Sequence, residues 1–478
     1  MPGRSQSHLT ASADPSKSAD AGDARPSGSW GSRLTSDNRN LIGGLAVILT
    51  VLATFYVRPY SLIMYAYYFV LWGGFAYALH RKQFRDFSFA YIVNSLAIAI
   101  FFVVQTKYYP ESYGTTSPLG SWTDDSFFFA LAADHVPSSL ELRQSYSEYS
   151  QPFSTLVSVL TLPTTYHPMD VIFFQSGTAA LLATFTKRFL WQMSSDSKLS
   201  NTAYILAITC PFLMMNGGLI FIRDTLAAAL FIYALSCLFD RRFILAGLAV
   251  LLELIIRPGT GIILMPAIAL IYLSSQRIIS QRNLLVLALC LPLAAVVLLR
   301  ATVLGDLLPG YAGAIEQVGL GGRQVFTDLR ADAGSNALFL SLQEQPFLIK
   351  LVLNGGYMFA YPFLDPMEPF STPYFDLRTV LMGIVAPVYA FWLNGWFIAG
   401  AITRVRAMRR QYQVLWATII TLLIVGTYSL QTRHKTIIYP LYFIIIAIGM
   451  IRAKPLDRQI GYSFSFALVL LQLAISLD

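Results

Sequence analysis

The stretch Leu41–Val57 reads LIGGLAVILTVLATFYV, and Ser61–Leu79 follows it as SLIMYAYYFVLWGGFAYAL. Each comes close to the roughly 20 apolar residues that a helix needs to cross a bilayer. The whole chain has the same character, because 55% of its 478 residues are hydrophobic and only 13% are charged. A soluble fold cannot hide that much apolar surface, so lipid must cover part of it.

Similar apolar segments recur along the chain and predict an all-α fold, a polytopic transmembrane helix bundle of about 13 helices. After the two segments above, the predicted spans are Ser88–Thr106, Met169–Thr186, Thr202–Ile222, Asp224–Phe239, Phe243–Ile256, Gly259–Ser275, Leu284–Val303, Val380–Ile402, Val414–Leu430, Ile437–Ile451 and Ile460–Leu477. Residues 1–38 are rich in Ser, Ala, Asp, Gly and Pro, which predicts a disordered tail ahead of a transmembrane domain over 39–478. No signal peptide is expected, because the first apolar segment lies behind this polar tail.

Basic residues cluster in the short connections between the predicted spans. With the N-terminus in the cytoplasm, every cluster falls on the cytoplasmic side, as the positive-inside rule requires. The net charge of +8 therefore reflects membrane topology, and no nucleic-acid partner is expected. Two long connections, 107–168 and 304–379, then become extracytoplasmic loops. The clusters are Arg25, Arg33 and Arg39; Arg81, Lys82 and Arg85; Lys187 and Arg188; Arg241 and Arg242; Arg277 and Arg282; Arg404, Arg406, Arg409 and Arg410; and Arg452, Lys454 and Arg458.

A few ionisable residues break this pattern, because they lie at predicted outer helix ends or inside an apolar segment. Charges at membrane depth are costly and are kept mainly where they pair or line a pathway. Glu253 lies one helical turn before Arg257, so an ion pair between them is one explanation. For Arg223 and Asp224, the alternative explanation is that they cap two helices at a tight outer turn. The full set is Arg58, Arg223, Asp224, Glu253, Arg257, Arg300, Arg433, His434 and Lys435. Arg58 and Arg300 lie near helix ends, where their long side chains can reach the membrane surface.

Arginines gathered at outer helix ends suit an anionic ligand, because the planar guanidinium pairs with phosphate or carboxylate through two hydrogen bonds. The head of a pyrophosphate-linked lipid lies at that depth. Such cations would also stabilise a departing diphosphate in a transfer reaction. The second loop adds Arg323, behind three glycines, and Arg378 in a Pro-rich stretch, although ordinary loop chemistry also explains both.

An acidic pair, Asp124 and Asp125, precedes the aromatic sequence SFFFALA in the first loop. One carboxylate is a candidate base toward a sugar hydroxyl, or a ligand for a metal ion. Capping of a helix that follows explains the pair as well. The five histidines have no metal-site spacing and no nucleotide-binding motif is present. No cofactor is therefore expected, apart from a divalent cation if these acids hold one.

Several short motifs resemble those of a known family. The motif nearest the N-terminus is the acidic pair with its aromatic sequence, and the one nearest the C-terminus is a basic cluster followed by a proline. The motifs are Asp124–Ala130, Tyr149–Phe153, Arg433–Lys435 with Tyr439–Leu441, and, more weakly, Ile222–Leu226. Together they resemble bacterial polytopic glycosyltransferases of the GT-C superfamily, taken to include O-antigen polymerases and ligases. Many GT-C enzymes carry the acidic loop after the first helix, whereas here it follows the third predicted span.

The resemblance implies an enzyme of the bacterial cytoplasmic membrane that transfers sugar on the extracytoplasmic side from a polyprenyl-linked saccharide. Arg223, Arg257 and Arg433 would bind the lipid phosphate and stabilise it as the leaving group. Asp124 or Asp125 would activate the acceptor hydroxyl, and His434 is a second candidate base. The remaining substrate-binding candidates are Glu253, Asp224, Lys435, Arg323, Arg378 and Tyr439.

Polymerisation of polysaccharide repeat units is the leading expectation for this enzyme. One alternative is a GT-C enzyme that moves a single sugar from a polyprenyl monophosphate. Another is a flippase or transporter of lipid-linked oligosaccharides, which should show charges along a central path. A structural membrane subunit without catalysis is the fourth possibility.

Overall fold

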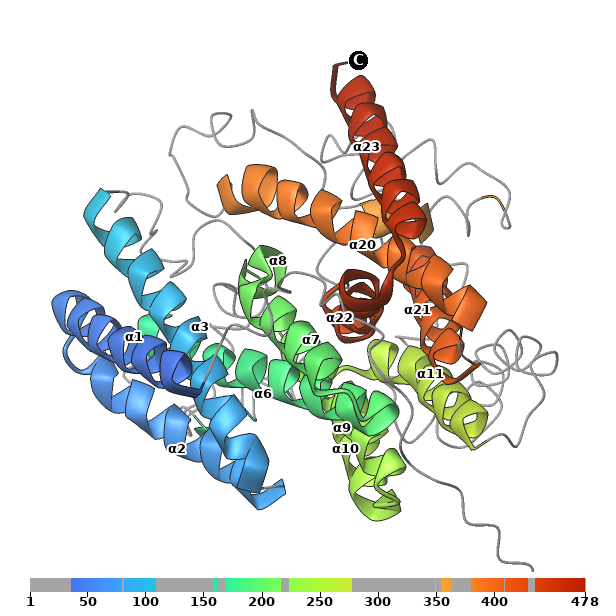
Figure 1. Cartoon of the computed structure of the whole chain (residues 1–478). Coiled ribbons are helices and arrows are strands. Elements are labelled where there is room, and N and C mark those ends of the chain that lie inside the picture. Colours follow the sequence, from blue (N-terminus) through green and yellow to red (C-terminus); the bar gives the residue numbers. More distant parts are fainter. Residues whose placement is uncertain are drawn as a thin grey trace, which may run out of the picture.

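The computed structural model describes residues 36–79, 81–108, 168–215, 223–276, 380–407, 409–428 and 435–477, with isolated positions near 153–160 and 349–362. These residues are helical apart from short connections, and no strand occurs among them. Figure 1 shows the helices as one assembly, with α1 to α3 on one flank and α20 to α23 on the other. The all-α prediction is therefore confirmed for the described part of the chain.

The helices carry the labels of Figure 1. They are α1 (Ser36–Val57), α2 (Ser61–Leu79), α3 (Arg81–Tyr108), α6 (Pro168–Ser194), α7 (Ser197–Thr209), α8 (Pro211–Met214), α9 (Asp224–Phe239), α10 (Phe243–Ile256), α11 (Pro258–Ser275), the π-helical turn η5 (Leu381–Val385), α20 (Ala386–Ala407), α21 (Arg409–Tyr428), α22 (Lys435–Arg452) and α23 (Pro455–Leu477).

Each predicted span that falls on described residues coincides with a helix, and α9 and α10 have the predicted bounds. The exception is Thr202–Ile222, which is broken at Cys210. Pro211 has no backbone N–H and disfavours the α conformation in the residue before it. Cys210 is accordingly extended, with φ −69° and ψ 114°. The predicted span Leu284–Val303 lies outside the described residues.

Among the described residues, five helical segments are long and apolar enough to cross a membrane: α1, α2, α3, the segment Gly383–Thr403 across η5 and α20, and α22. The outer surfaces of α1 and α2 are apolar, since Leu41 on α1 is 74% exposed and Val70 on α2 is 70% exposed. Ile244 on the shorter apolar helix α10 is 81% exposed. Apolar side chains exposed at this scale fit a multi-pass membrane protein whose surface meets lipid. The count of about 13 spans stays a prediction.

The core lies around α6, α9 and α22, whose side chains are buried along most of their length. Two helices approach backbone to backbone where α20 crosses α22. A Cβ atom placed on Gly449 would lie 2.1 Å from the carbonyl oxygen of Trp396, and one on Gly400 would lie 2.2 Å from that of Ile445. Small residues at such crossings allow this close packing in membrane proteins.

Three ion pairs join the ends of helices on one side of the bundle. Lys187 at the end of α6 pairs with Asp86 at the start of α3 at 2.6 Å. Arg188 pairs with Asp240, at the end of α9. Arg452, at the end of α22, pairs with Asp196 between α6 and α7 at 2.7 Å.

These contacts bring several of the basic clusters to one end of the bundle, which we call the basic end. The helices α6, α9 and α22 finish there, so α9 and α22 both begin at the other end, which we call the opposite end. The turn from α10 to α11 at Arg257 lies at the opposite end too, because α10 starts at the basic end directly after Asp240–Arg242.

Candidate functional site

The N-termini of three helices lie at the opposite end. Helices α9, α11 and α22 all begin there, and α9 packs against α10, α11 and α22. Each N-terminus carries unsatisfied N–H groups and roughly half a positive charge from the helix dipole. A basic residue stands at each start: Arg223 before α9, Arg257 before α11 and Lys435 at the first position of α22. This end of the bundle therefore combines helix N-termini with basic side chains.

Arg257 and Asp224 form the innermost ion pair of this region. The Arg257 guanidinium forms an ion pair with the Asp224 carboxylate, and their side chains are only 6% and 2% exposed. Arg257 follows the end of α10 and precedes Pro258, which disfavours helical backbone at Arg257. Its φ of −146° and ψ of 78° are extended, so its side chain leaves the α10 helix register. The pair joins the end of α10 to the start of α9.

Glu253 does not take part in that pair, although it lies one turn before Arg257. It is 1% exposed, and its Oε1 atom has no hydrogen-bond partner among the described residues. The i, i+4 pair considered from the sequence requires helical backbone at both positions. The extended backbone of Arg257 removes that condition, and Asp224 takes the guanidinium instead. Glu253 thus remains a buried acid next to a charged cluster.

Arg223 is more accessible than Arg257. It is half-buried, immediately before the first residue of α9, and its Nη1 donates to the carbonyl oxygen of Ile256 at 3.4 Å. This contact places Arg223 at the turn that carries Arg257. Of the candidates from the sequence, Arg223, Asp224 and Arg257 thus lie around one turn, through contacts between α9 and the end of α10.

Lys435 is the third cation of the region, and it is 1% exposed. Its ammonium donates to the carbonyl oxygen of Phe359 at 3.0 Å. It also lies 5.6 Å from the ring centre of Tyr439 and 5.4 Å from that of Tyr442. Aromatic faces attract a cation, and the attraction grows when water is excluded. Tyr439, a candidate from the sequence, therefore lies against a cation.

Three residues that contact Lys435 or its two tyrosines did not stand out in the sequence. The Tyr442 hydroxyl donates to the Asn394 side chain of α20, and the ring of Phe212 lies 5.1 Å from that of Tyr439. Asn394 is a fully buried amide inside an apolar helix, which is a signal that the sequence does contain. Its partner Tyr442 is not visible without the packing of α20 on α22.

A second polar cluster of the opposite end involves Asp170, in the first turn of α6. Asp170 is fully buried, accepts a hydrogen bond from the Ser61 hydroxyl, and lies 4.0 Å from the Arg58 guanidinium. An acid at the start of an apolar helix is favoured by the helix dipole. This pair links α1, α2 and α6 and explains how Arg58 is accommodated at the end of an apolar helix.

Six of the predicted site residues lie outside the described residues: Asp124, Asp125, Arg323, Arg378, Arg433 and His434. Arg433 and His434 directly precede α22 in the chain. Among the described residues, no group of three or more His, Cys, Asp or Glu side chains is arranged to hold a metal ion. The candidates that the structure describes are thus Arg223, Asp224, Glu253, Arg257, Lys435 and Tyr439. Arg223, Asp224 and Arg257 are joined at the turn from α10 to α11, whereas Lys435 lies against Tyr439 at the start of α22.

The chain was compared with models of protein families, with curated proteins and with solved structures, and no match was found in any of the three comparisons. The fold supports assignment to the multi-pass helical membrane proteins, because the described part of the chain contains five helices long and apolar enough to cross a membrane. Its polar cluster at the opposite end combines helix N-termini with buried cations, an arrangement suited to an anionic group.

Proposed function

We propose that the protein is a membrane glycosyltransferase that acts on a polyprenyl-linked saccharide at the opposite end of the bundle. The proposal places the basic end in the cytoplasm, because basic connections favour that side. The opposite end then faces the extracytoplasmic side of a bacterial cytoplasmic membrane. The reaction would polymerise polysaccharide repeat units, as the motifs in the sequence suggest.

One observation carries the proposal: three of the helices that begin at the opposite end, α9, α11 and α22, each start at a buried or half-buried cation. Desolvated cations are costly to keep. A lipid-linked phosphate or pyrophosphate would compensate them, and its negative charge grows when the sugar leaves. Cations fixed in advance stabilise that charge without reorganisation at the moment of reaction.

The accessible and buried cations would have different roles. Arg223 is half-buried, so it is the residue that would contact the phosphate. Arg257 is nearly buried and already bonded to Asp224, so it would hold the start of α9 in position. The predicted roles of Arg433, His434, Asp124 and Asp125 complete the proposal, with an acid or His434 accepting the proton from the acceptor hydroxyl.

Substitution of Arg223 tests the proposal. Loss of one charge-stabilising group costs about a hundredfold to a thousandfold in rate. We therefore expect cells with Arg223→Gln to lose long-chain glycan while membrane levels of the protein stay normal. The matched control is Arg242→Gln, an exposed arginine of the basic end, which should leave the glycan unchanged.

Analysis of the lipid-linked glycans separates the possible reactions. Deletion of the gene should cause single lipid-linked repeats to accumulate if the protein is a polymerase. Loss of one sugar from the glycan would indicate the single-sugar GT-C enzyme instead. Unchanged glycan in both the deletion and the Arg223→Gln strain would refute glycosyl transfer.

A further inference from the structure

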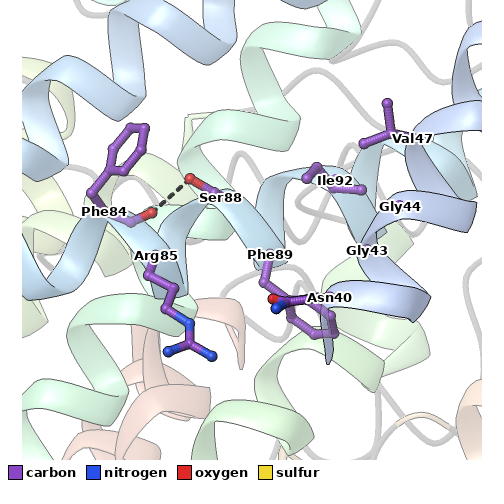
Figure 2. A pocket seen from close by; sticks show the side chains of 9 residues that line it. All are labelled: Asn40, Gly43, Gly44, Val47, Phe84, Arg85, Ser88, Phe89 and Ile92. Atoms are coloured by element: carbon purple, nitrogen blue, oxygen red, sulfur yellow. Dashed lines mark hydrogen bonds between the residues drawn. The ribbon is translucent and has the colours of Figure 1, made fainter. Parts of the chain in front are cut away.

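A groove between α1 and α3 lies away from the cluster at the opposite end. It has a volume of about 410 Å³ and is lined by Asn40, Gly43, Gly44, Val47, Phe84, Arg85, Ser88, Phe89 and Ile92 (Figure 2). Both helices start at the basic end, since α2 returns between them, so they run in the same direction. The groove therefore opens near the basic end, and α1 and α3 each form one of its walls.

Glycines on α1 make room for the groove. A Cβ atom placed on Gly44 would meet nothing within 4 Å, and one on Gly43 would meet only a ring carbon of Phe89, at 3.9 Å. Glycine inside a helix costs about 1 kcal/mol relative to alanine. Two adjacent glycines beside open space thus keep a hollow on a surface that meets lipid, where side chains would otherwise fill it.

Polarity changes along the groove. Asn40 and Arg85 lie near the starts of their helices, whereas Val47 and Ile92 lie seven residues further on, roughly 10 Å deeper at the helical rise. One half of the hydrocarbon core of a bilayer is roughly 15 Å thick. The groove thus offers polar groups at the depth of lipid headgroups and apolar walls along part of one leaflet.

Arg85 gives the polar mouth a positive charge. It is exposed and forms no ion pair within the described parts of the chain. Asp86, the nearest acid in sequence, is already paired with Lys187 at 2.6 Å. The Ser88 hydroxyl donates its hydrogen bond to the Phe84 carbonyl oxygen, so the side chains of Arg85 and Asn40 are the donors left for a headgroup.

We propose that this groove binds one anionic phospholipid of the leaflet at the basic end. The phosphate would pair with Arg85 and accept from the Asn40 amide, and one acyl chain would lie over Gly44 toward Val47 and Ile92. Charge complementarity at Arg85 and the match of the apolar walls to chain depth select this ligand. The inference is independent of the reaction at the opposite end.

The test uses the full-length protein in detergent, titrated with dioleoyl phosphatidylglycerol or dioleoyl phosphatidylcholine and followed by native mass spectrometry. The wild type should bind one phosphatidylglycerol more tightly than phosphatidylcholine. Arg85→Gln should weaken binding of phosphatidylglycerol about fivefold, because one basic side chain contributes that much at an anionic surface. Gly44→Leu should fill the groove and abolish binding of this first lipid.

Two control variants separate the groove from general effects. Gly74→Leu changes an exposed glycine of α2 that also has nothing within 4 Å, and Arg241→Gln removes an exposed arginine elsewhere at the basic end. Both should bind phosphatidylglycerol like the wild type. Arg85 is exposed, so Arg85→Gln decides the question even if Gly44→Leu fails to fold.

Three results would overturn the inference. The first is equal binding of the two lipids by the wild type. The second is a loss in Arg241→Gln as large as in Arg85→Gln, which would mean diffuse attraction to the basic end. The third is unchanged binding by a folded Gly44→Leu protein.

Discussion

The two ends of the bundle use the same residue types in different surroundings. At the basic end, Lys187 pairs with Asp86 and Arg188 with Asp240, and the four side chains are between 17% and 28% exposed. At the opposite end, the Arg257–Asp224 pair is almost fully buried. Partly hydrated pairs contribute little to stability and cost little to keep. In a buried pair, both ions have lost their hydration, which costs several kcal/mol of free energy per ion.

The difference indicates which charges need an explanation beyond topology. Basic residues between spans follow from the positive-inside rule, and their pairing with nearby acids is incidental to it. The buried cations of the opposite end do not follow from that rule, and each of them costs free energy because it is removed from water. Function is the usual reason for retaining such groups, so experiments that compare the two ends test the proposal most directly.

The largest effect is expected for Arg257→Ala. It leaves Asp224 buried without its cation, a change that typically costs about 3–5 kcal/mol. The matched substitution at the basic end, Arg188→Ala, removes a partly exposed pair and should cost less than about 1 kcal/mol. Thermal unfolding of the purified proteins in detergent measures both.

A double substitution isolates the charge from the packing. Arg257→Met together with Asp224→Leu removes both ions, and it should recover most of the lost stability because apolar replacements of buried pairs are often neutral. Equal losses from Arg257→Ala and Arg188→Ala would erase the distinction between the ends. So would a double variant no more stable than Arg257→Ala.

Lys435→Met should have a smaller effect on stability and a large one on activity. The variant loses one hydrogen bond and two ring contacts, but it also removes the cost of burying an ammonium group. We expect a net change within about 1 kcal/mol, with a loss of glycan synthesis of about tenfold or more.

Lys187→Met is the control for Lys435→Met, because it removes a lysine of the basic end and its pair with Asp86. Glycan synthesis should stay normal in that variant. Full activity of Lys435→Met would show that this buried lysine serves packing alone, and it would remove one of the three cations from the proposed site.

Local sequence accounts for much of the fold. The bounds of α9 and α10 follow from charged residues that flank apolar segments, and they were predictable to the residue. The break at Cys210 had a signal that the predictions did not use, because Pro211 forces Cys210 out of the helix. Pro258 does the same to Arg257, between two spans that the sequence already separates.

Partners on different helices were not predictable. Asp224 and Arg257 were both singled out, but their pairing depends on how α10 packs against α9. The same holds for Tyr442 and Asn394, which come from α22 and α20. A single sequence indicates which residues are unusual for their depth in a membrane, whereas the tertiary packing decides which of them meet.

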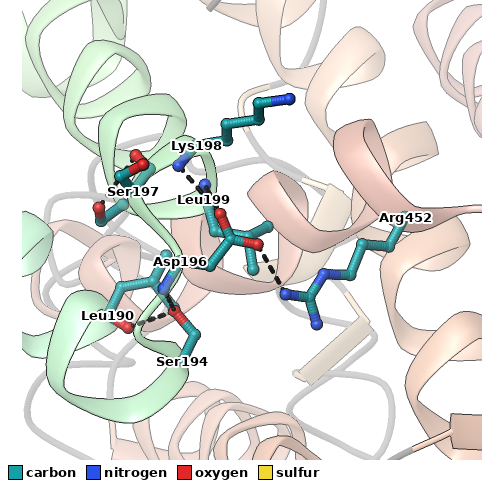
Figure 3. Close-up of polar contacts among 8 residues, drawn as sticks. Leu190, Ser194, Asp196, Ser197, Lys198, Leu199 and Arg452 are labelled. Carbon is teal, nitrogen blue, oxygen red and sulfur yellow. Dashed lines mark hydrogen bonds and ion pairs between the residues drawn. The ribbon is translucent and has the colours of Figure 1, made fainter. Parts of the chain in front are cut away.

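The smallest effect concerns Asp196, which caps α7 at the basic end. Its carboxylate accepts from the amides of Lys198 and Leu199 and pairs with Arg452 at 2.7 Å (Figure 3). Burial raises the pKa of Asp196, but the hydrogen bond from Arg452 and those two amides outweigh it and bring the pKa below its ordinary 3.8. At acid pH near this pKa the unfolded chain therefore binds more protons than the folded protein does, so the free energy of unfolding rises with pH.

Asp196→Asn removes the charge and keeps the cap, because asparagine caps a helix about as well as aspartate. At neutral pH the variant should be less stable than the wild type by less than about 1 kcal/mol, since the pair is partly exposed. The difference should close as the pH falls below 3.8 and the wild-type carboxylate takes up its proton. Arg452→Gln should show the same convergence, measured as thermal midpoints across acid pH. A constant gap down to strongly acid pH would mean that shape, and not charge, holds this turn at the basic end, and the contrast with the buried pair of the opposite end would lose its electrostatic basis.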